Sequence, residues 1–112
     1  MASNISSTST VAIGGVDVEV FRADARGAVV NLKLLSITGN DNIVSVKIAN
    51  DNDIAFTPNG RQTVYIERNV TLYASPNNVL MRGAIALPPN AAILVSSDGG
   101  VDAIISGVSG EV

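Results

Sequence analysis

Hydrophobic and polar residues alternate one by one along several short stretches of this chain. Residues 16–20 are Val-Asp-Val-Glu-Val, and residues 44–48 are Val-Ser-Val-Lys-Ile. Successive side chains of a β-strand point to opposite faces, so this period of two predicts strands with one buried face and one face toward water. Other alternating or apolar segments lie at residues 9–13, 28–38, 63–67, 70–72, 79–81, 85–87, 92–95 and 101–108.

Residues that favour turns separate these segments, at 14–15, 39–42, 75–78 and 88–90, and the irregular region 50–60 predicts an exposed loop. Asp98-Gly99-Gly100 predicts a closing hairpin between residues 92–95 and 101–108. No stretch carries the apolar stripe of an amphipathic helix. The sequence therefore predicts an all-β fold, a single antiparallel β-sandwich or jelly-roll-like domain of about eight strands.

The longest apolar stretch, residues 28–38, changes phase in its second half. Val30, Leu32 and Leu34 share one face of a strand, whereas Leu35 and Ile37 continue on the other. We expect a β-bulge after Leu34, or burial of both faces of this strand.

The chain of 112 residues has the length of one domain. Its first eight residues, Met1 to Thr8, are uncharged, mostly polar, and lack the basic and apolar regions of a signal peptide. We expect an extended N-terminal arm at residues 1–8, ordered by a partner, and a β-sandwich domain at residues 9–112. Deletion of this arm is expected to leave the domain folded and to weaken its attachment.

Composition excludes several kinds of chemistry. The chain has no Cys and no His, which excludes disulfides, thiolate metal sites and the Ser-His-Asp and Cys-His catalytic arrangements. Its seven basic side chains are scattered and its net charge is −3, so we expect no nucleic-acid partner. No apolar run is long enough for a membrane helix, so we expect no membrane partner. We also expect no cofactor and no enzymatic activity.

The remaining polar groups are weak candidates for a site. Asp17 and Glu19 share one strand face ~7 Å apart, which a glycosidase pair could use, but a solvated strand face explains them better. Residues 51–53 (Asp-Asn-Asp) lack the glycine and distal glutamate of a calcium loop. The aromatic side chains either pack in the core or anchor an interface: Phe21, Phe56, Tyr65 and Tyr73.

The second half of the chain has a characteristic order of turns and strands. Residues 87–95 (Leu-Pro-Pro-Asn-Ala-Ala-Ile-Leu-Val) lead to Ser97-Asp98-Gly99-Gly100, and the strand at 101–108 ends in Ser-Gly-Val. Together with residues 28–48 and 58–66, this order resembles small β-sandwich virion proteins of tailed phages. The resemblance covers residues 26–108. The first twenty-five residues depart from these proteins, and their Pro-Ala-Gly turn before the long strand is absent.

The resemblance implies a structural role in a virion. We expect a capsid decoration (cement) protein, made in the host cytoplasm, that binds and reinforces the outer surface of a phage shell. Its partners would be the major capsid protein or another virion protein, and its own copies in a homotrimer. Alternatives are a tail or head-fibre accessory protein, and a carbohydrate- or receptor-binding module that uses Tyr65, Tyr73 or residues 50–53.

The residues expected at the partner interface lie in the arm and in two loops: Ser3, Asn4, Ile5, Asn52, Phe56, Pro58, Arg61, Pro76 and Asn77.

Overall fold

The computed structural model describes residues 3–11, 17–37, 40–50, 63–73 and 79–109. They form eight strands and no helix: β1 (Ser3–Val11), β2 (Val18–Arg22), β3 (Ala28–Ser36), β4 (Asn42–Ala49), β5 (Thr63–Leu72), β6 (Val79–Leu87), β7 (Ala92–Ser97) and β8 (Val101–Ser109). The predicted all-β fold of about eight strands is confirmed. Within the described ranges, no helix is long and apolar enough to cross a membrane.

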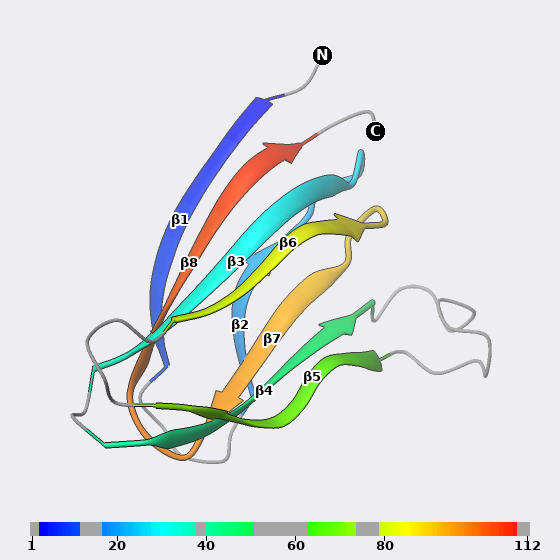
Figure 1. The fold of residues 1–112 in the computed structure, drawn as a ribbon. Helices are drawn as coiled ribbons and strands as arrows, with labels where there is room; N and C mark the ends of the chain where they lie inside the picture. The colour runs from blue at the N-terminus through cyan, green and yellow to red at the C-terminus, as the bar shows by residue number, and fades with distance from the viewer. Residues whose placement is uncertain (1–2, 12–16, 38–39, 51–62, 74–78, 110–112) are drawn as a thin grey trace.

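The strands form two antiparallel sheets. Sheet A has the order β1-β8-β3-β6 and sheet B has the order β2-β7-β4-β5; Figure 1 shows sheet A as one layer and sheet B as the other. The pairs β1–β8, β2–β7, β3–β6 and β4–β5 nest inside one another along the chain. This is the arrangement of a long hairpin wound into two layers, which is a jelly roll.

Aliphatic side chains from both sheets fill the space between the layers. Val30, Leu32 and Leu34 of β3 are buried, and Asn31 and Lys33 between them are exposed. The predicted period of two is thus a period of inward and outward side chains. Among the aromatic residues, Phe21 packs against this core and the two tyrosines are exposed, whereas Phe56 lies outside the described residues.

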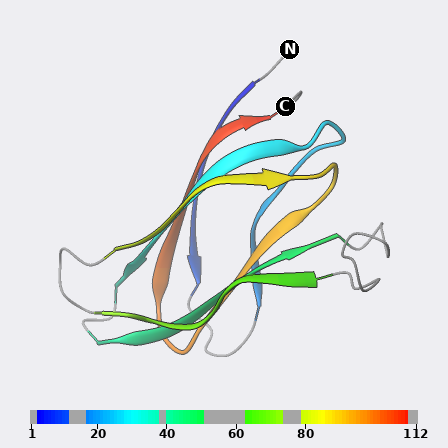
Figure 2. The same cartoon turned by 45° about the vertical axis from the view of Figure 1, so that its right-hand side comes forward.

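The first strand begins earlier than its pattern predicts. β1 pairs with β8 without a register shift from Ser3↔Ser109 to Val11↔Val101, and Ile5 packs against the core. Figures 1 and 2 both show the start of β1 beside the end of β8. The expected arm at residues 1–8 and boundary at residue 9 are corrected, because the sheet already includes Ser3. Main-chain hydrogen bonds need no apolar side chains, so a run of Ser and Thr forms this strand without apolar alternation.

Residues 98–100 reverse the chain but do not close a hairpin. β7 belongs to sheet B and β8 to sheet A. The Asp98 N–H donates to the Ile43 carbonyl at 3.2 Å, and Asp98 Oδ1 accepts the Ile43 N–H at 2.9 Å. The Gly100 carbonyl accepts the N–H of Ile37, just after β3, at 3.1 Å. The predicted hairpin is therefore wrong, since this turn crosses from one layer to the other.

The β-bulge expected after Leu34 is wrong, whereas the other alternative, burial of both faces, holds in part at Leu35, beside the buried Leu34. β3 pairs with β8 from Ala28 to Ser36 in one register. Leu35 is half-buried, and Ile37 follows the strand with 52% of its surface exposed. The irregularity of this region lies instead against β6, between Val30 and Leu32.

Candidate protein-binding face

The face of sheet A that points away from sheet B carries few charges. Cross-strand partners form a row from β1 to β6 that holds Thr8, Ile104, Lys33 and Met81. The next row holds Ser6, Ser106 and Asn31. Met81 is 65% exposed, and Val108 on the same face is 41% exposed. Lys33 is the one charged residue of these two rows, and Asp102 lies in the next row of the same face.

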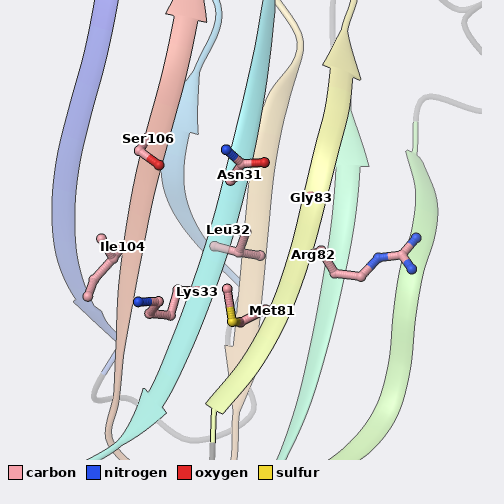
Figure 3. Close-up of a pocket in the computed structure, with 8 residues that line it drawn as sticks. All are labelled: Asn31, Leu32, Lys33, Met81, Arg82, Gly83, Ile104 and Ser106. Atoms are coloured by element: carbon pink, nitrogen blue, oxygen red, sulfur yellow. The ribbon is translucent and has the colours of Figure 1, made fainter.

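A hollow of about 270 Å³ opens on this face over β8, β3 and β6. It is lined by Asn31, Leu32, Lys33, Met81, Arg82, Gly83, Ile104 and Ser106. Figure 3 shows Ile104, Lys33 and Met81 side by side at one level, with Ser106, Asn31 and Gly83 at the next. This surface is named the Lys33 hollow below.

A β-bulge in β6 creates the hollow. Two residues of β6, Gly83 and Ala84, stand opposite Asn31 of β3, because the register shifts between Val30 and Leu32. Ala84 has a φ of 54°, and its N–H donates to Asn31 Oδ1 at 3.0 Å. Gly83 has no side chain, and a Cβ at this position would lie 3.3 Å from the same oxygen. The space beside Lys33 therefore stays open.

Two cationic residues, Lys33 and Arg82, lie beside the apolar side chains of the hollow. Lys33 makes no ion pair with any residue that the structure describes. Arg82 points away towards β5, where its Nε lies 3.5 Å from Glu67 Oε1. The hollow therefore fits an apolar side chain next to a carboxylate or carbonyl oxygen, which the Lys33 ammonium would contact.

The interface residues expected from the sequence are only partly placed. Ser3, Asn4 and Ile5 lie in β1 at the edge of sheet A; Asn4 is exposed and Ile5 is half-buried against the core. Six others lie outside the described residues: Asn52, Phe56, Pro58, Arg61, Pro76 and Asn77. The sequence reasoning missed the Lys33 hollow. Its only signal was Lys33 itself, the one charge in the apolar stretch 28–38.

A second recess, of about 470 Å³, lies on the outer face of sheet B. It is lined by Asp17, Ile43, Ser45, Lys47, Tyr65, Asn69, Ser96, Ser97 and Asp98. The Arg68 guanidinium carbon lies 4.0 Å from the centre of the Tyr65 ring, and Lys47 Nζ lies 5.4 Å from it. This surface, named the Tyr65 recess, is polar, and cations contact its aromatic ring.

The acidic candidates near this recess have basic partners. Asp17 forms an ion pair with Lys47, and Glu19 Oε1 lies 2.7 Å from Arg22 Nη2. No group of three or more potential metal-ligating side chains occurs within the described ranges. Asp24 has its pKa lowered below the usual value of 3.8, first by the Arg26 backbone N–H that donates to its carboxylate and then by the Arg26 side chain. That contact belongs to the turn between β2 and β3.

No protein family model matches the chain, and no curated protein matches its sequence. One solved structure, IMPa from Pseudomonas aeruginosa in complex with an O-glycopeptide, is similar to it with a TM-score of 0.46 and 10% identity. The match covers 96% of this chain and 13% of IMPa, so the chain spans a small part of that protein's length.

Proposed function

We propose that this protein is a non-enzymatic virion structural protein that decorates the outside of a phage shell through the outer face of sheet A. The observation that carries the proposal is the Lys33 hollow on a broad sheet face that carries few charges. Exposed apolar surface with few charges is typical of the central part of protein–protein interfaces. The resemblance of residues 26–108 to small virion proteins of tailed phages supports the shell as the partner.

The chemistry of the hollow indicates what the shell must present. Met81 and Ile104 would contact an apolar side chain, and Lys33 would pair with an acidic group beside it. An ammonium that loses water in such an interface needs a partner charge or hydrogen-bond acceptor, since an unpaired buried charge is costly. The proposed docking element of the major capsid protein is therefore an apolar residue next to Asp or Glu.

Co-sedimentation of the purified protein with phage shells that lack it tests this proposal. Lys33→Glu combined with Met81→Ser should weaken binding roughly a hundredfold, because it removes one charge pair and one apolar contact. Arg68→Glu is the matched control, a charge reversal on an exposed side chain of sheet B. If the Lys33/Met81 variant bound like the wild type and the Arg68 variant lost binding, the docking surface would lie on sheet B instead.

A tail or a head fibre is the alternative attachment point for the same face. Imaging of the assembled particle distinguishes these positions, because decoration of the shell lattice gives regularly repeated density over the capsid. Density confined to the tail or to single vertices would assign the protein to those parts instead.

The Tyr65 recess favours a second candidate function, the binding of a carbohydrate or glycan receptor. Asp17, Asn69 and Asp98 offer hydrogen-bond acceptors around the ring. Because Arg68 covers part of the ring, a sugar would bind mainly through these polar groups. A glycan array tests this function: a hit that Tyr65→Ala and Asn69→Ala abolish and Met81→Ser retains would support it, whereas no hit would leave it without support.

A further inference from the structure

The described strands leave four sheet edges, and three of these edges are blocked against pairing with another strand. Each of these three edge strands carries a bulge where its register shifts: β2 at Val20, β5 around Arg68 and Asn69, and β6 at Gly83 and Ala84. Charged side chains accompany each bulge, in Glu19 and Arg22, Glu67 and Arg68, and Arg82. Bulges and charges of this kind prevent one sheet from adding to another.

The fourth edge, β1, has none of these features. Its nine residues, Ser-Asn-Ile-Ser-Ser-Thr-Ser-Thr-Val, contain no charge and no proline. They pair with β8 in a single unbroken register, so the strand follows its neighbour without a bulge. Because β8 lies on one side of β1 only, alternate N–H and C=O groups of β1 point away from the sheet, and no described strand pairs with them. Such an edge is a template for a further strand.

We propose that β1 pairs antiparallel with β1 of a second copy of this chain and joins the two A sheets into one continuous sheet. Self-pairing suits this strand because two-fold symmetry brings a segment against itself. A charged strand would set like charges opposite each other, whereas β1 has only uncharged side chains, so no like charges meet in any register.

The pairing has a geometric consequence. Directly opposite residues of an antiparallel pair point to the same face, so the outer faces of both A sheets would lie on one side of the dimer. Ser6 and Thr8, which are exposed on this face, would flank the junction. The assembly that this pairing gives is a dimer, which differs from the homotrimer expected from the sequence. The inference does not rest on the proposed function.

Sedimentation equilibrium and native mass spectrometry of the full chain test the pairing. The wild-type protein should form dimers, and Ser6→Lys with Thr8→Lys should weaken dimerisation roughly tenfold or more, because lysines then face lysines across the symmetry axis. Met81→Lys with Ala86→Lys is the matched control, with the same added charge at exposed positions of β6, the opposite edge of sheet A. It should leave dimerisation unchanged. Circular dichroism verifies that both variants are folded.

Hydrogen exchange gives a readout that does not depend on the variants. Rising protein concentration should slow exchange at alternate amides of residues 3–11 and leave the edge amides of β2, β5 and β6 unchanged. Three results would overturn the inference. The protein could remain a monomer up to millimolar concentration, it could form a trimer, or its dimer could be disrupted by the β6 lysines but not by the β1 lysines. A dimer without protection in β1 would also overturn it.

Discussion

Gly107 lies in β8, between the neighbouring strands β1 and β3, where it pairs with Ile5 and Val30. A Cβ at this position would lie 2.2 Å from the Val29 carbonyl oxygen and 2.7 Å from Val30 Cα. Both atoms belong to the backbone of a central strand, which cannot move without disturbing its own ladder. Glycine is thus required at this position by the close approach of two strands.

We predict that Gly107→Ala lowers the free energy of unfolding by roughly 3 kcal/mol, because the added methyl group forces β8 and β3 apart. Urea denaturation followed by circular dichroism measures the change. Ser106→Ala, at the exposed neighbouring position, is the control and should change stability by less than about 0.5 kcal/mol. Equal stabilities of the two variants would show that the strands accommodate a Cβ.

The sequence predicted the positions of most strands, but it did not predict which strands pair with one another. The period of two located β2 and β4 because each has one buried face, as Val20, Val44 and Val46 show. Local patterns carry no information on which distant strand completes a ladder. Only β4 and β5, of the described strands, are neighbours in both sequence and sheet. The turn residues around Asp98 therefore correctly indicated a reversal of the chain. The predicted pairing of the two strands that flank this turn was wrong.

The sequence pattern also did not show that residues 3–8 belong to β1. The expected effect of deleting these residues therefore changes. We predict that deletion of residues 1–8 lowers the free energy of unfolding by roughly 2–4 kcal/mol, since it removes the Ile5 core contact and most of the ladder to β8. Thermal unfolding measures the loss. The triple variant Asn4→Ala, Ser6→Ala, Thr8→Ala keeps the backbone and changes only exposed side chains, so it should unfold like the wild type. An unchanged melting temperature after the deletion would instead support the free N-terminal arm that the sequence predicted.

At the scale of the whole molecule, the candidate site depends on residues that the fold brings together. Ile104, Lys33 and Met81 come from three strands far apart in sequence and meet in one row of sheet A. No motif links them, so they could not be selected before the sheet order was known. Sequence reasoning placed the interface in the N-terminal arm and in two polar loops, and loops often carry binding residues. The residues that share the outer face of a jelly roll can be identified only once each strand is assigned to one of the two layers.

The same long-range pairing predicts slow folding. Ser3 must find Ser109, and β2 must find β7, before either ladder stabilises the chain. We expect refolding from urea in roughly 10 ms to several seconds, as for other all-β domains dominated by distant contacts. Stopped-flow circular dichroism measures the rate. Complete refolding within microseconds would mean that local contacts dominate the transition state.

Because Ser3 and Ser109 are ladder partners, the backbone leaves this domain close to the point where it enters. A linker of a few residues would close it into a ring, and the same proximity suits its insertion into a surface loop of a host protein with little distortion of either. The intact jelly roll could therefore be inserted into another protein, with both of its ends joined to the same loop.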